Sequence, residues 1–370
     1  MTAPTRAPAA PVPPVQDFAY QSLPGRVVFG AGSSARTGAE VQALGCSRAL
    51  VLSTPNQADQ AETLRDQLGE LAAGTFTGAA MHTPVEVTGE AIARLRSVGA
   101  DCTVAIGGGS TIGLGKAIAA RTGVPQVVLP TTYAGSEVTP VLGQTEDGRK
   151  TTHRSLDVLP ETVIYDVDLT LSLPPSLSAS SGLNSMAHAV EALWAQEANP
   201  ITSLMAGEAL RALAGALPRI MEVPHDRPAR SSALYGAWLS GTCLAAVGMA
   251  LHHKLCHVLG GTFGLPHAET HAVVLPHVVA FNAPAAGAAV ESVAAALGVR
   301  DAAPGLRDLV LGLGLPGSLR ELGMPEDGIE IAADRAVQDP YWNPRPVTRA
   351  SVETLLADAW NGAAPRSWPI

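Results

Sequence analysis

The sequence predicts an α/β nucleotide-binding domain with a parallel, Rossmann-like sheet, followed by an all-helical catalytic domain. Short apolar strands alternate with helical segments as far as residue 166, and a triple glycine follows one strand and opens a helix. After residue 174 no strand alternation appears, and alanine- and leucine-rich helical patterns are separated by short Gly/Pro turns. We therefore expect a flexible tail over residues 1–16, the nucleotide-binding domain over 17–173 and the helical domain over 174–370.

The composition fits a folded protein of two domains and excludes several classes of partner. The 370 residues suffice for two cores, and 46% hydrophobic with 15% charged residues argue against disorder across the body. A net charge of -9 makes nucleic acid a poor partner, and no stretch is long and apolar enough to predict a membrane span. The proline-rich residues 1–16 do not resemble a signal peptide. The four cysteines lack CxxC spacing, which predicts a reducing cytoplasm without a disulfide framework.

The first predicted elements are a strand at 26–30, a helix within 31–45 and a strand at 48–53, which together form a βαβ unit. The segment from Gly30 to Ala35 matches the dinucleotide fingerprint GxGxxA between strand and helix. Alternatively, glycine is needed there only for the backbone angles of a tight turn. The second strand ends at Ser53 and Thr54, so no carboxylate is expected there to repel the 2′-phosphate of NADPH.

A stronger candidate for phosphate binding follows a predicted helix at 85–98 and a strand at 101–106. There Gly107, Gly108 and Gly109 precede Ser110 and Thr111 at the start of a helix. Glycines at such a turn let backbone N–H groups close on a phosphate, and the helix dipole favours the anion. The alternative is a glycine-rich turn without a ligand.

A strand at 124–130 leads into a hydroxyl-rich loop at the same end of the sheet, where ligands of doubly wound folds collect. Its candidate residues are Thr131, Thr132, Tyr133 and Ser136, and an ordinary turn with capping hydroxyls is the alternative. Next comes a polar, hairpin-like segment with Arg149 and Lys150, which either is solvated or faces an anionic ligand. After a strand at 162–166, the first helix of the second domain is expected to begin near Pro174.

Six of the ten histidines lie between Gly248 and His277. His253 and His257 are four residues apart and share one helix face, as do His267 and His271, and a Gly-Gly break and a Leu-Pro pair separate the two pairs. The pattern predicts two helices that present imidazoles around a turn. Such a cluster is typical of a metal site or of proton-transfer groups, whereas a single histidine is more often a capping or core residue.

The order of the motifs resembles that of the iron-containing alcohol dehydrogenase family, whose fold is shared with dehydroquinate synthase. The motifs are GGGS, TTxxxSE, xxHAxE, HxxxHxLG and PHxxxH, and the resemblance covers nearly the whole chain after residue 17. In that family three histidines and one aspartate hold a divalent metal beside the nicotinamide. Position by position, the resemblance implies His188, His253 and His267 as metal ligands, with His257 as an unliganded neighbour.

This sequence departs from the family pattern at two positions. Asn184 stands at the aspartate position, and a neutral amide is a poorer ligand for a divalent metal, so we expect a vestigial site and no metal requirement. Gly113 also stands where the family usually has an aspartate. Both departures, with residues 131–154, 252–277 and 339–348, are similar to the maleylacetate reductase branch of the family. That resemblance implies reduction of the conjugated C=C bond of maleylacetate to 3-oxoadipate by NADH or NADPH, in the degradation of aromatic compounds.

The implied reaction assigns a role to each candidate residue. Hydride addition leaves an enolate, so we expect His253 and His257 to supply the oxyanion contact and the proton, with Tyr133, His188 and His267 completing the pocket. The pyrophosphate is assigned to the segment from Gly107 to Thr111. The nicotinamide side of the coenzyme is assigned to Thr131, Thr132 and Ser136, and Thr54 leaves NADPH permitted. The two substrate carboxylates need local cations, for which the candidates are Lys254, Arg149, Lys150 and Arg345.

Several alternatives remain open from the sequence. Lys254 alternatively extends from a helix surface with its charge in water. The chain is alternatively a metal-dependent alcohol dehydrogenase or carbonyl reductase of the same fold, a scaffold protein that lost its metal, or a reductase of another unsaturated oxo-acid. The resemblance also implies a homodimer.

Overall fold

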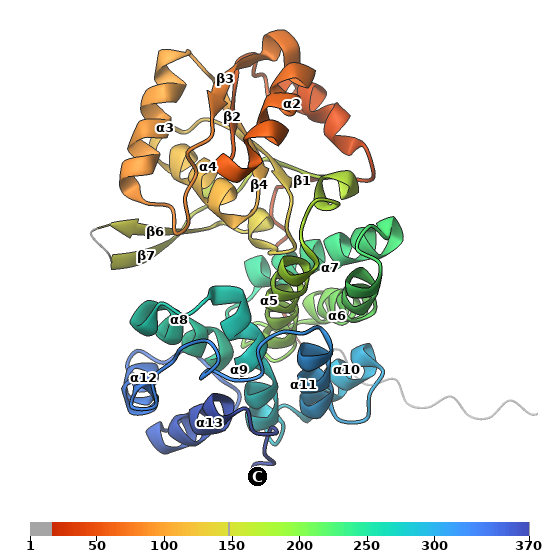
Figure 1. Cartoon of the computed structure of the whole chain (residues 1–370), viewed down its shortest axis with the longest axis vertical. Helices are drawn as coiled ribbons and strands as arrows, with labels where there is room; N and C mark the ends of the chain where they lie inside the picture. The colour runs from red at the N-terminus through yellow and green to blue at the C-terminus, as the bar shows by residue number, and fades with distance from the viewer. Residues whose placement is uncertain (1–16, 147–148, 370) are drawn as a thin grey trace, which may run out of the picture.

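The structure is a computed structural model that describes residues 17–146 and 149–369. Figure 1 shows an α/β region, at the top, stacked on a helical region that contains the C-terminus. The sheet has six parallel strands in the order β1-β8-β5-β4-β2-β3. These strands are β1 (Arg26–Phe29), β2 (Ala49–Leu52), β3 (Ala72–Phe76), β4 (Cys102–Gly107), β5 (Gln126–Pro130) and β8 (Thr162–Tyr165).

Helices cover both faces of the sheet, as a parallel sheet requires. They are α1 (Thr37–Ala43), α2 (Ala58–Leu68), α3 (Val85–Ser97) and α4 (Gly109–Thr122). One apolar cluster joins α1 and α2 to the sheet through Val41 and Leu64, and another joins α3 and α4 through Ile92 and Ile118. Two separate cores on opposite faces are the arrangement of a doubly wound fold, which confirms the predicted class.

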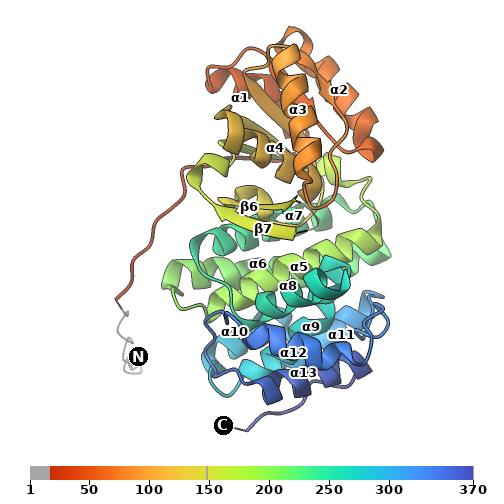
Figure 2. The same cartoon turned by 90° about the vertical axis from the view of Figure 1, so that its left-hand side faces the viewer.

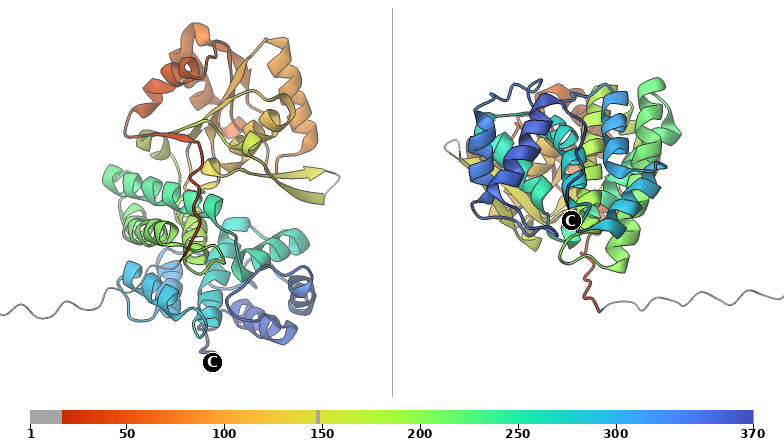
Figure 3. Two further views of the ribbon diagram at one scale, coloured as in Figure 1. Left: turned by 180° about the vertical axis from the view of Figure 1, so that it is seen from behind. Right: turned by 90° about the horizontal axis from the view of Figure 1, so that it is seen from below.

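The helical region begins where the sequence predicts, because α5 starts directly after Pro174. Its helices are α5 (Pro175–Leu193), α6 (Pro200–Glu222), α7 (Arg227–Ala246), α8 (Leu251–Phe263), α9 (His267–Asn282), α10 (Gly287–Leu297), α11 (Ala302–Gly312), α12 (Gly328–Val337) and α13 (Arg349–Asn361). They share one large apolar core, in which α5 packs against α6, α7 and α9. The view from below in Figure 3 shows these helices packed side by side.

Two details of the α/β region differ from the sequence prediction. β1 and β2 are parallel and connected through α1, but β8, β5 and β4 lie between them in the sheet, so they are not an adjacent βαβ pair. β3 and α2 were not predicted. The polar segment does form a hairpin, because β6 (Val141–Glu146) pairs antiparallel with β7 (Arg149–Arg154). Figure 2 shows this hairpin at the level where the two regions meet.

The two regions are joined where the loop after β5 approaches α7. Gly135 has a φ of 78°, and a Cβ at Gly241 would lie 2.0 Å from the Gly135 carbonyl oxygen. Only two glycines permit so close an approach of backbones. The guanidinium of Arg154 adds a second connection by donating to the carbonyl of Ala245 at 2.5 Å.

Residues 17–25 form an arm that leaves the α/β region and extends along the helical region (Figure 3). Its aromatic side chains Phe18 and Tyr20 are exposed. Among the described residues no single helix is long and apolar enough to cross a membrane. Helices α7 and α8 meet that criterion only as a pair, and a bend of 97° separates them.

Candidate functional site

The first glycine turn is filled by a carboxylate of the protein itself. Asp166, which follows β8, is 1% exposed. Its Oδ1 accepts a hydrogen bond from the N–H of Gly32 at 2.9 Å, and its Oδ2 accepts one from the N–H of Ser34 at 2.8 Å. These are the backbone donors that a phosphate would need. The GxGxxA segment is therefore a structural turn, which is the alternative that its short motif left open.

The second glycine turn is shaped differently. Gly107 has a φ of 156°, and a Cβ there would lie 2.4 Å from Thr111 Oγ1. A Cβ at Gly108 would lie 2.9 Å from Thr132 Cγ2, whereas one at Gly109 would meet nothing within 4 Å. Among the described residues, no side chain caps the start of α4. The turn thus combines close backbone packing with a helix N-terminus whose N–H groups are open to an anion, and it fits a pyrophosphate.

Neighbouring hydroxyls are held at this turn by Gln57, which the sequence analysis missed. The Gln57 side chain donates to Thr131 Oγ1 at 2.8 Å, and its Oε1 accepts from Thr54 Oγ1 at 3.2 Å. Thr54, Thr131 and Thr132 are therefore brought to the edge of the sheet beside the glycines, as predicted. Gln57 lies in a short 3-10 helix after β2, in a segment without a recognisable motif.

The loop that carries Ser136 is fixed by Lys116 on α4, which is 2% exposed. Its ammonium donates to the carbonyls of Ser136 and Thr139, each at 2.7 Å, and to that of Val141 at 3.0 Å. Burial lowers the pKa of Lys116 to about 7, although the nearby Glu137 carboxylate opposes this shift. Lys116 thus positions the loop between β5 and β6 instead of offering a charge to a ligand.

The departure at Gly113 has a structural explanation. A Cβ at Gly113 would lie 2.4 Å from Thr83 Oγ1, and Thr83 is buried. The Thr83 side chain therefore occupies the space that a side chain at position 113 would need.

Five histidines from three helices gather below the loops of the α/β region. His188 on α5 stacks on His253 of α8, with 5.0 Å between ring centroids. His257 of α8 stacks on His267 of α9 at 6.5 Å, and both are exposed. His271 lies between the helices, 4.9 Å from the His253 ring and 4.5 Å from the His267 ring. The predicted pairing of two helical segments around a turn is confirmed.

A buried carboxylate, Glu191, orients this cluster and was not among the predicted site residues. Its Oε2 lies 2.6 Å from His253 Nδ1. The same carboxylate accepts from the N–H groups of Ala250 and His252 at the start of α8, at 2.9 and 2.8 Å. Since a carboxylate accepts hydrogen, His253 carries its proton on Nδ1 and directs the Nε2 lone pair into the cluster. The HAxE motif contains Glu191, but its partners lie about 60 residues away.

The family-level comparisons agree with this architecture over nearly the whole chain. Residues 24–167 match the family model described as iron-containing alcohol dehydrogenase. Residues 178–360 match the model of the C-terminal region of the same family. The chain belongs to the iron-containing alcohol dehydrogenase family. The two matches meet near the start of α5, where the sheet ends and the helical region begins.

Relatives within this family are similar to the chain over its length. A maleylacetate reductase from Rhizobium sp. strain MTP-10005 is 56% identical over 95% of this chain and 100% of its own. One from Sphingobium indicum is 56% identical over 94% of this chain and 99% of its own. The crystal structure of maleylacetate reductase from Agrobacterium tumefaciens superimposes with a TM-score of 0.92 at 57% identity, covering 95% of this chain and 100% of that one.

The residues at the family's metal positions fit a divalent ion, with one anionic ligand fewer. His188 Nδ1, His253 Nε2 and Asn184 Oδ1 are buried and have no hydrogen-bond partner among the described residues. Burial and the neighbouring histidines lower the pKa of His188 well below its usual value, so this ring is neutral and free to coordinate. Glu191, a buried carboxylate beside these residues, is committed to backbone N–H groups and to His253. Three imidazoles and an amide therefore form a neutral ligand set.

The side chains of two predicted site residues are held in structural contacts. The Tyr133 hydroxyl accepts from Arg230 at 3.3 Å, and this guanidinium also lies 3.4 Å from Ser178 Oγ. Ser178 precedes His188 by ten residues of α5, which is roughly 15 Å along a helix. Arg345 donates to the carbonyl of Phe281, fourteen residues beyond His267 on α9 and roughly 21 Å along it. Both side chains are fixed in structural contacts, and their predicted roles in the site stay predictions.

The other three predicted cations are Lys254, whose side chain the structure describes, and Arg149 and Lys150, whose side chains it does not. The ammonium of Lys254 lies 5.5 Å from the centre of the Tyr341 ring. The Tyr341 hydroxyl lies 3.1 Å from His257 Nδ1, so Lys254 is placed at the exposed edge of the cluster. Tyr341 was not predicted as a site residue. The side chains of Arg149 and Lys150 lie outside the described residues, and only their backbone in β7 is placed.

Proposed function

We propose that this chain catalyses the NAD(P)H-dependent reduction of the conjugated C=C bond of maleylacetate to 3-oxoadipate, in the degradation of aromatic compounds. The names of its relatives support the substrate, and the histidine cluster with Glu191 behind His253 is the observation that carries the chemistry. The open glycine turn of α4 supports the use of a nicotinamide dinucleotide.

Hydride addition to the carbon β to the ketone leaves an enolate, which must be stabilised and then protonated at the α carbon. His253 suits the first task when its ring is protonated, because Nε2 then donates while the carboxylate of Glu191, 2.6 Å from Nδ1, stabilises the positive charge. His257 suits the second task, because it is exposed and regains a proton from water. His188 and His267 stack on these two rings and fix their planes.

The coenzyme is assigned to the sheet edge above the cluster. Gly107, Gly108 and Gly109 take the pyrophosphate, with Ser110 and Thr111 in the first turn of α4. Thr131 and Thr132 lie beside this turn, and Ser136 follows in the loop that Lys116 holds, so these three face the nicotinamide side. Thr54 offers a hydroxyl in place of a carboxylate, which permits both NADH and NADPH.

The substrate carries two carboxylates, whereas the chain has a net charge of -9. Lys254 at the exposed edge of the cluster is our first candidate for one carboxylate. Arg149 and Lys150 of the β6–β7 hairpin are candidates for the other, because the hairpin lies where the two regions meet (Figure 2). Because the substrate and the chain are both negatively charged, cations near the site are needed to attract the substrate.

A divalent metal held by His188, His253 and His267 would supply a Lewis acid for the ketone oxygen. We propose that the reaction does not require it, because Asn184 removes the anionic ligand and the enolate is reached through imidazole donors. The metal-dependent reduction of a carbonyl is the second candidate function, and it is favoured by His188 Nδ1 and His253 Nε2, which are buried without a hydrogen-bond partner among the described residues.

We also propose a homodimer that works in the cytoplasm. The extended arm of residues 17–25 exposes Phe18 and Tyr20 and suits contact with a second copy. The four cysteines are free thiols, which suits a reducing compartment. Light scattering on the full chain and on a chain that begins at residue 26 tests the arm, and an unchanged mass after truncation would refute its role.

The test of the reaction uses freshly generated maleylacetate and protein treated with a chelator. NADH and NADPH oxidation is followed, and the product is identified by its mass. We expect 3-oxoadipate at an undiminished rate without metal. Loss of activity that added iron or zinc restores would favour the metal-dependent function. In that event Asn184→Asp should raise both metal affinity and activity, whereas our proposal expects higher affinity without higher activity.

A further inference from the structure

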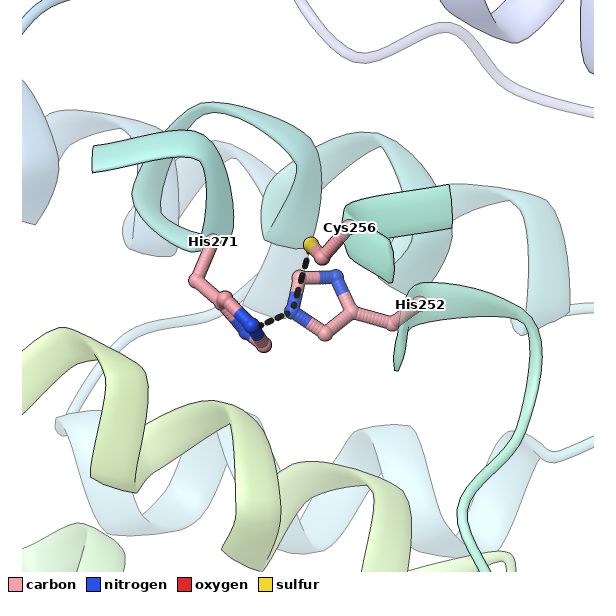
Figure 4. A group of neighbouring side chains, drawn as sticks. All are labelled: His252, Cys256 and His271. Carbon is pink, nitrogen blue, oxygen red and sulfur yellow. Dashed lines mark hydrogen bonds between the residues drawn. The ribbon is translucent and has the colours of Figure 1, made fainter. Parts of the chain in front are cut away.

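Directly behind the proposed active site lies a second group of side chains that no step above uses. His252 and Cys256 are four residues apart on α8, and His271 faces them from α9 (Figure 4). All three are at most 1% exposed. We refer to these three residues as the inner cluster.

The donor atoms of the inner cluster converge on one point. His252 Nε2 lies 2.8 Å from His271 Nδ1 and 3.7 Å from Cys256 Sγ, and the three atoms lie within 4.8 Å of one another. Zinc bonds of about 2.0–2.1 Å to nitrogen and 2.3 Å to sulfur imply tetrahedral separations of about 3.3 Å between nitrogens and about 3.6 Å between nitrogen and sulfur. Cys256 Sγ is already at about this spacing from His252 Nε2, and the two imidazoles need to separate by about half an ångström.

The two imidazoles of the inner cluster are available as ligands. His252 Nδ1 and His271 Nε2 are buried without a hydrogen-bond partner among the described residues, so neither ring is tied down on its far side.

The charges around the inner cluster match a divalent cation. Burial raises the pKa of the Cys256 thiol well above its usual value, and Glu191 raises it further. A cation must therefore displace the thiol proton, after which the thiolate and a divalent ion leave one net positive charge. Glu191 is fully buried and accepts from the N–H of His252 at 2.8 Å, so a negative charge shared with His253 also lies beside the inner cluster.

We propose that His252, Cys256 and His271 form a binding site for a borderline or soft divalent cation such as Zn²⁺, Cd²⁺ or Co²⁺. Binding releases the Cys256 proton, forms a metal–sulfur bond and replaces the hydrogen bond between the two histidines, with no change of oxidation state. This site contains sulfur, whereas the family's metal positions offer only imidazoles and an amide. The fourth position of a tetrahedron is left for water.

The experiment titrates Co²⁺ into the metal-free full-length protein and records its near-ultraviolet and visible absorption. Ligation by a thiolate produces an intense sulfur-to-cobalt charge-transfer band that nitrogen ligands do not produce. We expect one equivalent of Co²⁺ to develop this band and to release one proton in weakly buffered solution. Cys256→Ser and His271→Asn should lose the band, and circular dichroism checks that both variants fold.

The matched control is Cys46→Ser, because Cys46, Asp101 and Cys102 form another group of converging ligand atoms in the α/β region. This variant should keep the full band. A band that survives in Cys256→Ser, or cobalt that binds only with the weak visible bands of nitrogen ligands, would overturn the proposal. The readout is independent of the reductase reaction, so failure of one proposal leaves the other standing.

Discussion

The two glycine turns of the α/β region have similar sequences and opposite uses. At Gly30–Ala35 the backbone N–H groups of Gly32 and Ser34 are bound by the carboxylate of Asp166. At Gly107–Thr111 no side chain within the described residues caps the helix. The two turns differ in whether a side chain of the protein already binds their backbone N–H groups. The number and spacing of the glycines do not reveal this difference.

The same contrast extends to the helical region. The carboxylate of Glu191 accepts hydrogen bonds from backbone N–H groups at the start of α8, and it also contacts Nδ1 of His253. Carboxylates from distant parts of the chain thus fill two sets of backbone donors, and the start of α4 is left open. Other helices, such as α3 and α9, also lack a side-chain cap, so the glycine turn that precedes α4, and not the missing cap alone, indicates an anionic ligand.

The largest expected effect comes from making the open turn resemble the filled one. Gly109→Asp places a carboxylate at the start of α4, where a Cβ meets nothing within 4 Å, so the fold is preserved. We expect NADH to bind about 100-fold more weakly, because the new charge takes the N–H groups and repels the pyrophosphate. Fluorescence titration measures the change. Gly109→Ala is the matched control, and equal losses in both variants would contradict a charge effect.

The next largest effect concerns the carboxylate behind His253. Glu191→Gln removes the negative charge that stabilises a protonated His253 ring, so we expect kcat to fall by roughly 10- to 100-fold with little change in KM. Glu191→Asp should recover part of the rate. Glu197→Gln is the control, because Glu197 binds the N–H of Gly248 just before α8 but contacts no histidine in the described structure. An unchanged kcat in Glu191→Gln would remove Glu191 from the mechanism.

Emptying the filled turn should affect stability and not coenzyme binding. Asp166→Ala leaves the N–H groups of Gly32 and Ser34 without their acceptor, and we expect a loss of about 2 kcal/mol in the free energy of unfolding. Urea denaturation measures it. Asp168→Ala removes only a half-exposed ion pair with Arg227 and should cost less than about 1 kcal/mol. Weaker NADH binding by Asp166→Ala would contradict our proposal, because it would indicate that the coenzyme binds at the Gly30–Ala35 turn.

The smallest effect is a pH dependence at a more exposed carboxylate of the same kind. Burial raises the pKa of Asp101, but hydrogen bonds from the N–H groups of Ser47 and Arg48 outweigh it and hold the pKa below its usual value. The ionised carboxylate of Asp101 therefore stabilises the folded protein at pH values above the pKa of an aspartate in the unfolded chain, about 3.9. This contribution to the free energy of unfolding is lost as the pH falls through the lower pKa of Asp101 in the folded protein. Urea midpoints of the wild type and Asp101→Asn should converge only below about pH 4. A difference between the two urea midpoints that stays constant down to roughly pH 2.5 would contradict this prediction.

Local patterns were sufficient to predict most of the fold. Period-2 and period-3.6 apolar spacing located β1, β2, β4, β5, β8 and the start of α5 correctly. β3 was missed because Ala72–Phe76, with two alanines and a glycine, has only one β-branched residue, Thr75, and is only half-buried. Strand order was also beyond prediction, because it depends on contacts between residues far apart in the sequence.

The candidate site shows the same division between local and distant information. The triple glycine and the paired histidines are local signals, and the structure places both where the spacing predicts. Asp166 and Glu191 decide what these motifs do, yet they act on residues 134 and about 60 positions away. The contact of the Tyr133 hydroxyl with Arg230 was not predictable for the same reason, since Arg230 lies 97 residues further along the chain.

The contact between Gly135 and Gly241 sets the distance between the backbones of the two regions, which side chains cannot alter. At this point the spacing of the two regions equals the thickness of two main chains, because a Cβ on either residue would overlap the other backbone. Exchanges of side chains elsewhere on α7 leave that spacing unchanged. The packing around the histidines can therefore vary while the separation of the two regions at this contact stays fixed.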